Sequence, residues 1–384
     1  MLTTLLRTHL GPYKRLIALV AVLQAVQTAA ALTLPGLNAD IIDHGVLPGD
    51  TGYIRTHGAL MLLWALVQGT FAIAAVYVGA RIAMGFGRDL RGALFHRVIG
   101  FSAREVGTFG APSLITRITN DVQQVQLLVV MAATMAIAAP ITLVVGIVFA
   151  VREDAGLSSI LVVAIPVAAV VLGSIVAQMV PTFRRMQECI DRINRVLREQ
   201  ITGIRVVRAF VREPEETARF AAANEELTAT ALRGGRLMTM MFPTVNLLTN
   251  LSSVAVLWVG ADRIDAGRLQ VGSLVAYLTY LVQILMSVVM LTFTLSMVPR
   301  ASVAAGRIQE VLDTETSVRP PATPVREVRE HGLLELRNVG FHYPGAEQPV
   351  LSGISFTTRA GQTTAIIGST GAGKTTLINL IQRL

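Results

Sequence analysis

The 384-residue sequence predicts a mainly α-helical membrane protein with six spanning helices, followed by the beginning of an α/β domain. Two observations favour this fold class. Hydrophobic residues make up 52% of the chain and charged residues only 15%, against about 25% in ordinary soluble domains. The C-terminal part, in contrast, carries short strand-like patterns and a glycine-rich loop. This composition excludes both a single soluble globule and a disordered chain.

Six long stretches contain no Asp, Glu, Lys, Arg or His. They are residues 16–39, 58–80, 127–151, 157–183, 237–261 and 269–299. A membrane-spanning helix needs about 20 apolar residues, and in lipid its backbone polar groups must be bonded internally, so each stretch is predicted to be a transmembrane helix. The first stretch follows basic residues, as a signal peptide does. It continues beyond Pro35, however, which is longer than a usual signal core, and we interpret it as an uncleaved helix.

The net charge of +8 is divided unevenly between the two sides of this topology. The connecting segments 40–57, 152–156 and 262–268 together carry 4 basic and 7 acidic residues, whereas the rest of the chain carries 29 basic and 18 acidic. The positive-inside bias therefore predicts that both termini are cytoplasmic. Because the basic residues follow topology rather than forming one patch, they do not indicate a nucleic-acid partner.

Two of the inner segments, residues 81–126 and 184–236, are too long for simple loops and are predicted to be cytoplasmic helical hairpins. In the second, apolar residues recur at spacings of 3 or 4, which is typical of an amphipathic helix that continues the fourth span. The expected breaks are near Gly107–Pro112 in the first hairpin and at Arg212–Glu216, with Pro214, in the second.

A proline-containing, charged segment separates the spans from the C-terminal part, and it carries Pro320, Pro321 and Pro324. Strand patterns follow at Leu333–Val339, Val350–Thr358 and Thr363–Ile367. The predicted division is a transmembrane domain, a linker and the start of an α/β domain, at residues 1–312, 313–332 and 333–384.

The segment from Gly368 to Thr375 fits the pattern G-x-x-x-x-G-K-[ST], placed between a predicted strand and a predicted helix. Glycines let the backbone N–H groups surround phosphate oxygens, Lys374 reaches the β- and γ-phosphates, and the Thr375 hydroxyl is a Mg²⁺ ligand. Lys374 is one of two lysines among 33 basic residues, which fits the need for a compact point charge. The predicted ATP-binding residues are Gly368, Ser369, Thr370, Gly371, Ala372, Gly373, Lys374, Thr375 and Thr376.

Tyr343 precedes this loop by about 25 residues, in the sequence Phe341-His-Tyr-Pro. An aromatic ring there could stack on a nucleotide base. Taken alone, Tyr343 fits an ordinary strand aromatic better.

The order of six spans, two long hairpins, a linker and a phosphate-binding loop resembles an ABC exporter half-transporter. In this resemblance Gly368–Thr375 is the Walker A loop, and Tyr343 matches the aromatic residue that stacks on adenine. Arg117-Ile-Thr-Asn-Asp121-Val and Arg208-Ala-Phe-Val-Arg-Glu213 match the first and second intracellular loops. The resemblance implies coupling residues at Arg117, Asn120, Asp121, Phe210, Arg212, Glu213 and Glu216.

The resemblance also implies ATP-driven export of a hydrophobic or amphipathic substrate, with ATP and Mg²⁺, in the plasma (inner) membrane. The partner implied is a second half-transporter, in a homodimer or a heterodimer. The family's signature motif, Walker B carboxylates and switch histidine follow the Walker A loop, and these 384 residues contain none of them. We therefore expect no catalytic residue in this chain, which binds ATP but does not hydrolyse it alone. The alternative is a non-catalytic membrane subunit or gene remnant. An ion-coupled carrier is disfavoured because no span contains an acidic or basic residue.

Overall fold

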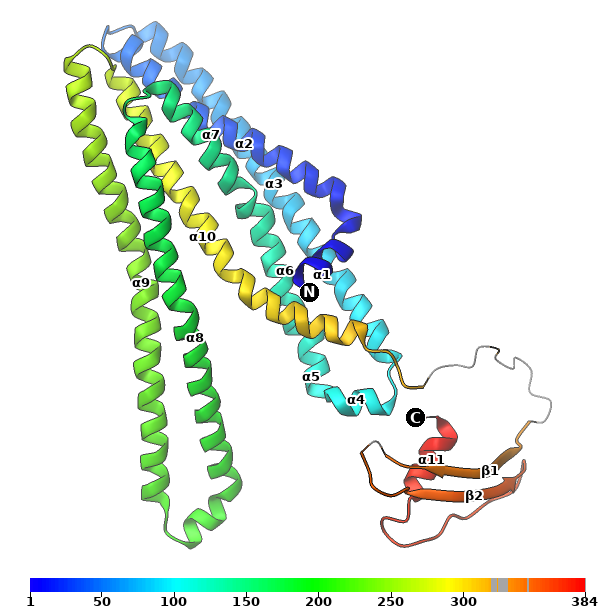
Figure 1. Cartoon of the computed structure of the whole chain (residues 1–384). Helices are drawn as coiled ribbons and strands as arrows, with labels where there is room; N and C mark the ends of the chain where they lie inside the picture. Colours follow the sequence, from blue (N-terminus) through cyan, green and yellow to red (C-terminus); the bar gives the residue numbers. More distant parts are fainter. Residues whose placement is uncertain (319–322, 324–330, 344, 384) are drawn as a thin grey trace. The chain divides into compact units, whose positions relative to one another are not determined.

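The computed structural model describes residues 1–318, 323, 331–343 and 345–383 (Figure 1). Pro320, Pro321 and Pro324 of the predicted linker lie outside the described residues. The chain divides into two compact units, Met1–Asp89 with Val122–Gly306 and Leu90–Asp121 with Arg307–Leu384. The following paragraphs describe each unit by itself.

Six helical segments among the described residues are long and apolar enough to cross a membrane. They are Gly11–Val46, Thr51–Ile99, Ala111–Glu153, Ser158–Ala209, Glu213–Asp265 and Val271–Asp313. Each overlaps one of the predicted uncharged stretches, which confirms the mainly helical fold with six candidate spans.

The helices run in the following order. They are α1 (Leu2–His9), η1 (Gly11–Tyr13), α2 (Lys14–Asp40), η2 (Ile41–Val46), α3 (Thr51–Ile99), α4 (Ala103–Phe109), α5 (Ala111–Thr116), η3 (Arg117–Asp121), α6 (Val122–Met131), η4 (Ala132–Ala136), α7 (Ala138–Glu153), α8 (Ser158–Ala209), α9 (Glu213–Asp265), α10 (Val271–Asp313) and α11 (Lys374–Gln382). Of these, η3 and η4 are π-helical turns within the helical run from α5 to α7, and η2 is a π-helical turn at the end of α2.

The core of the first unit lies where α2, α7, α8, α9 and α10 meet. Tyr277 and Tyr280 of α10 are fully buried there, and the Tyr280 hydroxyl donates to the carbonyl oxygen of Leu32 at 3.0 Å. On α3, by contrast, large apolar side chains such as Leu66 and Ile73 are exposed. These side chains belong to the uncharged stretch 58–80 of α3, and such an exposed apolar face is suited to contact with lipid.

Helices α8 and α9 form a long antiparallel hairpin (Figure 1). The chain turns between Ala209 and Glu213, where Val211 has a positive φ of 53°. The predicted break at Arg212–Glu216 was therefore placed too late. Pro214 lies in the first turn of α9, where its missing N–H has no intrahelical role, so it begins the helix rather than interrupting it.

In residues 81–126, which are predicted to form the first hairpin, α3 already ends at Ile99, ahead of the predicted break near Gly107–Pro112. A second break does fall inside the predicted range, at Gly110, where φ is 76°. Two short helices, α4 and α5, lie on either side of this glycine. Ser102 precedes α4 and forms a capping box with Glu105. The Ser102 side chain accepts from the Arg104 amide, and the Glu105 side chain accepts from the Ser102 amide.

The C-terminal strands β1 (Leu334–Phe341) and β2 (Leu351–Thr358) pair antiparallel, with Leu336 opposite Phe356. Leu377 of α11 packs against Leu336 and Leu351 beneath this pair. The predicted strand at Thr363–Ile367 is wrong: the described residues offer it no pairing partner, and Ile367 is 91% exposed. A strand exists only through its ladder with a neighbour, so an apolar pattern alone could not produce one.

Candidate functional site

The glycine-rich loop enters α11 through Gly373, whose φ is 83°. A Cβ atom at this position would lie 2.8 Å from Cδ2 of Leu351 and 3.3 Å from the carbonyl oxygen of Val350. Both the left-handed conformation and the close approach to β2 therefore require glycine here. Gly371 also has a positive φ, of 87°. The sequence spacing thus positions the loop directly at the N-terminus of a helix.

Lys374 closes the loop on itself. Its Nζ atom donates to the carbonyl oxygens of Gly368 and Ser369, at 2.8 Å and 2.7 Å. The first amides of α11 have no intrahelical acceptor, and the helix N-terminus carries a partial positive charge. A fixed ammonium group and unbonded amides at one place form a site that fits an anion such as phosphate. Ser369, Thr370 and Ala372 are exposed on the same loop.

Tyr343 lies next to the first turn of α11, although 33 residues separate it from Thr376. The hydroxyl oxygens of Tyr343 and Thr376 are 3.0 Å apart, within hydrogen-bond distance. The Tyr343 ring packs edge-to-face on Phe341, with centroids 5.1 Å apart, and the residue remains 48% exposed. Thr376 is buried and directs its hydroxyl at Tyr343, while Thr375 is exposed.

The first group of predicted coupling residues contacts the C-terminal part of α10 within the second unit. Arg117 donates through Nη1 to the carbonyl oxygen of Arg307 at 2.9 Å and to Oε2 of Glu310 at 2.7 Å. Asp121 is buried and pairs weakly with Arg307, at 3.9 Å. Asn120, between them in sequence, is exposed. Arg117 and Asp121 therefore fix this segment to α10, and Asn120 is left accessible.

The second group lies at the turn between α8 and α9. Phe210 is exposed at the end of α8, and Arg212 and Glu213 are exposed where α9 begins. Glu216 accepts from Nε2 of Gln200 through its carbonyl oxygen, at 2.9 Å. The start of α9 is thus hydrogen-bonded to α8, while an aromatic ring and charged groups are exposed at the turn.

Two family profiles match the chain, one over the helical region and one over the C-terminal part. The family profile described as ABC transporter transmembrane region matches residues 17–288, and the profile described as ABC transporter matches residues 351–384. The chain belongs to the ABC transporter family. The second match contains the glycine-rich loop and α11, so both family regions occur in the same chain.

Relatives of this ABC transporter chain include an uncharacterised ABC transporter ATP-binding protein of Mycobacterium tuberculosis, 51% identical over all of this chain and 66% of its own length. A multidrug efflux ATP-binding/permease protein of the same species is 33% identical over the whole chain and 32% of its own length. An ATP-dependent lipid A-core flippase of Aromatoleum aromaticum is 30% identical over 85% of this chain and 54% of its own length. The chain spans 66% of the length of the first of these relatives.

Sequence reasoning missed Glu105, which joins two distant parts of the ABC transporter chain's second unit. Its Oε2 accepts from the Ser102 amide at 2.9 Å and from the Ser102 hydroxyl at 2.6 Å, and its Oε1 accepts from the Ser317 amide at 3.1 Å. Burial disfavours the charged carboxylate, but these hydrogen bonds outweigh it and lower the pKa of Glu105 from 4.5 to about 2. The S-x-x-E pattern beginning at Ser102 could have signalled the cap, although not the contact with Ser317.

We expect protonation of Glu105 to release residue Ser317 from α4. Because the folded pKa lies below the unfolded one, the stabilisation is complete above about pH 4.5 and is lost as the pH falls towards 2. Glu105→Gln should imitate protonation at neutral pH and speed amide exchange at Ser317 roughly tenfold, the equivalent of about 1.4 kcal/mol. Hydrogen–deuterium exchange of the purified chain measures this. Arg104→Gln, an exposed neighbouring change, is the control, and equal exchange in both variants would contradict the expectation.

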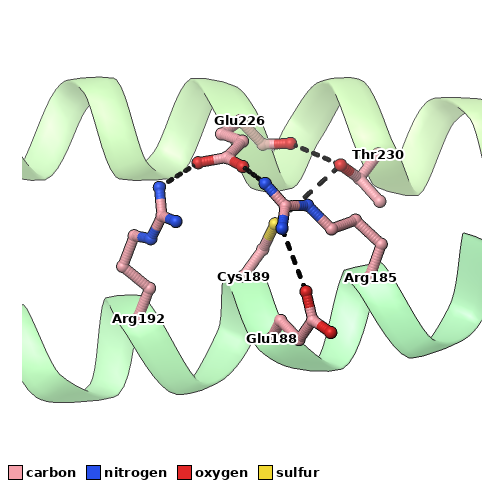
Figure 2. Close-up of polar contacts among 6 residues, drawn as sticks. All are labelled: Arg185, Glu188, Cys189, Arg192, Glu226 and Thr230. Carbon is pink, nitrogen blue, oxygen red and sulfur yellow. Dashed lines mark hydrogen bonds and ion pairs between the residues drawn. The ribbon is translucent and has the colours of Figure 1, made fainter.

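A second missed feature holds the α8–α9 hairpin together (Figure 2). Glu226 of α9 accepts from Nη2 of Arg185 at 2.6 Å and also pairs with Arg192, both on α8. Arg185 donates in addition to Glu188 at 3.0 Å. Exposed ion pairs each contribute less than about 1 kcal/mol, but one carboxylate shared by two guanidinium groups fixes the register of the two helices.

Proposed function

We propose that this chain is a subunit of an ATP-driven exporter that works as a dimer with a second half-transporter, identical or related. The observation that carries the proposal is a glycine-rich loop, closed by Lys374 at the N-terminus of α11, in a chain with six candidate spans. In the proposed orientation both termini are cytoplasmic and the membrane is the plasma (inner) membrane. The basic excess on the segments that would face the cytoplasm supports this orientation.

In the proposed site the amides of Gly371, Gly373 and Lys374 bind phosphate oxygens, and the Lys374 ammonium group exchanges its loop carbonyls for the β- and γ-phosphates. The half-exposed ring of Tyr343 stacks on adenine. Thr375 offers an exposed hydroxyl in the first turn of α11, an oxygen ligand of the kind that Mg²⁺ prefers. A Mg²⁺ ion bound there would neutralise charge on the β- and γ-phosphates.

The coupling residues transmit closure of the nucleotide sites to the spans in this proposal. ATP can drive that change only by binding the closed dimer more tightly than the open one. The exposed Phe210, with Arg212 and Glu213 beside it, supports a contact surface at the tip of the α8–α9 hairpin. Arg117 and Asp121 would instead stiffen the first coupling segment against α10.

The proposed cargo is hydrophobic or amphipathic. The uncharged spans support this class, since a charged substrate would meet no intramembrane partner of opposite charge. The names of two relatives, a multidrug efflux protein and a lipid A-core flippase, point the same way.

Two measurements test the proposal. The purified 384-residue chain should bind a photoreactive azido-ATP in the presence of Mg²⁺ without hydrolysing ATP, because these residues contain no Walker B carboxylate or switch histidine. Lys374-dependent turnover by this polypeptide would contradict that expectation. Inverted membrane vesicles containing the protein as isolated from its source organism should accumulate a lipophilic fluorescent dye on addition of ATP. Normal ATP binding with no ATP-dependent accumulation of any lipophilic dye or lipid would favour a non-catalytic membrane subunit.

A further inference from the structure

The first unit contains a cavity of about 380 Å³ beneath the N-terminal helix α1. Its wall is formed by side chains of α1, α2, α3, α6, η4 and α10, among them Leu6, Ile17, Ile82, Leu128, Ala136 and Leu295. The volume falls within the range of about 300–1,000 Å³ typical of small-molecule sites. All the residues that line the cavity belong to the first unit, and none of them is part of the glycine-rich loop.

The cavity exists because η4 presents small side chains to it. Ala132, Ala133 and Ala136 lie on this π-helical turn and line the space. The Gln24 side chain supports the turn by donating to the carbonyl oxygens of Ala133 and Thr134, at 3.5 Å and 3.3 Å. π-Helical turns recur at functional sites because they move side chains away from regular helical positions. Here the turn leaves room that larger residues would fill.

The lining offers an occupant almost no polar partner. Thr294 is the polar residue among those that line the cavity, and its hydroxyl already donates to the carbonyl oxygen of Met290 at 2.9 Å. Water needs two to four polar partners in such a space, so an apolar cavity stays dry unless an apolar ligand enters. The chemistry of the wall therefore selects a hydrocarbon group.

Three exposed cations lie within a few residues of the lining side chains in sequence. Helix α1 directs Leu2 and Leu6 into the cavity, while Arg7 on the same helix is exposed. Lys14 and Arg15, also exposed, begin α2 just before the lining residue Ile17. Within the described part of the chain none of these three cations has an ion-pair partner. Amphipathic helices with basic residues at the start of a span bind anionic lipid headgroups.

We propose that the cavity holds one acyl chain of an anionic membrane phospholipid, whose phosphate is bound by Arg7, Lys14 and Arg15. The lipid is a resident ligand that fills the space between α1 and the spans, and it is not the transported cargo. Part of the hydrocarbon lining and the unpaired cations come from the same two helices, α1 and the start of α2, and they match the two chemical parts of a single phospholipid. The inference goes beyond the proposed function, because lipid binding here requires neither ATP nor export.

Native mass spectrometry of the purified chain with phosphatidylglycerol tests the site. We expect one retained phosphatidylglycerol and a preference for it over phosphatidylcholine. Ala136→Phe fills the cavity and should reduce the bound fraction at least tenfold. Ala18→Phe, at an exposed position of α2 that does not line the cavity, is the matched control and should bind as the wild type does. Arg7→Gln combined with Lys14→Gln and Arg15→Gln should abolish the preference for phosphatidylglycerol.

A measurement on the unaltered chain covers the case in which Ala136→Phe fails to fold. Phosphatidylglycerol with a diazirine at the end of its acyl chain should label the segment from Leu128 to Ile137. Labelling confined to other segments, or equal binding of both lipids by the wild type, would overturn the proposal. In the protein isolated from its source organism, labelling should persist after ATP and Mg²⁺ are added. Loss of the label at that step would identify the lipid as cargo and would also overturn the inference.

Discussion

Replacement of Lys374 by alanine is expected to weaken ATP binding to the chain by about 100-fold or more. In the proposed site the ammonium group makes charge-assisted hydrogen bonds to phosphate oxygens, each contributing about 1.5–3 kcal/mol, and tenfold in affinity corresponds to about 1.4 kcal/mol. The same group fixes the loop, because it bonds the carbonyl oxygens of Gly368 and Ser369. The variant therefore loses both a phosphate ligand and the closed shape of the loop. Titration with a fluorescent ATP analogue measures the effect.

The chain provides a matched control for this experiment. Lys14 is its other lysine, so Lys14→Ala removes the same charge at a position remote in sequence from the loop. It should leave ATP affinity unchanged. Lys374→Arg should restore little, because a planar guanidinium cannot occupy the place of a compact ammonium group between two carbonyl oxygens. Equal ATP affinity in Lys374→Ala and Lys14→Ala would remove the phosphate-binding role from the loop.

The sequence predicted the helical part of the fold well because the bilayer leaves few solutions. An uncharged run of more than 20 residues can cross lipid only as a helix, so pattern and structure agree for all six candidate spans. The turn at Val211 was displaced because Pro214 was interpreted as a breaker, whereas proline is equally suited to the first turn of a helix. Local chemistry allowed both interpretations, and only the turn geometry distinguishes them.

Contacts between residues distant in sequence could not be predicted from local sequence patterns. The segment Thr363–Ile367 has the composition of a buried strand, but strand formation depends on neighbours that composition does not specify. The capping box at Ser102 was visible in sequence, yet its link to Ser317 connects residues 215 positions apart. Likewise, the resemblance directed attention to Tyr343, while its contact with Thr376 follows from the packing of β1 against α11.

The second large effect, a loss of folding stability, is expected when Asp154 is replaced. This residue lies in the short connection between α7 and α8. Its side chain is 5% exposed and makes three contacts: Oδ1 accepts from the Leu157 amide at 2.8 Å, and Oδ2 pairs with Nε and Nη2 of Arg263 at 3.0 Å and 2.7 Å. Arg263 belongs to the end of α9, so this one carboxylate joins the α7–α8 connection to a third helix. A Cβ atom on Gly156 would clash with Nη1 of Arg263, which shows how closely the guanidinium packs against the connection.

Asp154→Ala should lower the free energy of unfolding by about 3 kcal/mol, because breaking a buried pair leaves the remaining partner and a helix amide without their bonds. The effect belongs at the lower end of the range of about 3–5 kcal/mol, since Arg263 is 28% exposed and water can reach the freed guanidinium. Unfolding of the detergent-solubilised chain by increasing denaturant measures it. Asp265→Ala, an exposed change two residues beyond Arg263, should cost less than about 0.5 kcal/mol.

The pairing itself is isolated by the double variant Asp154→Ala, Arg263→Ala. If the two groups stabilise each other, each single variant contains the cost of an unpaired neighbour, and the double variant should lose less than the sum of the two. Arg263→Ala alone should be at least as costly as Asp154→Ala, because the carboxylate that it leaves unpaired is the more deeply buried of the two groups. Additive losses would show instead that Asp154 acts through the Leu157 amide alone, as a cap at the start of α8, and that the contact with α9 contributes nothing to stability.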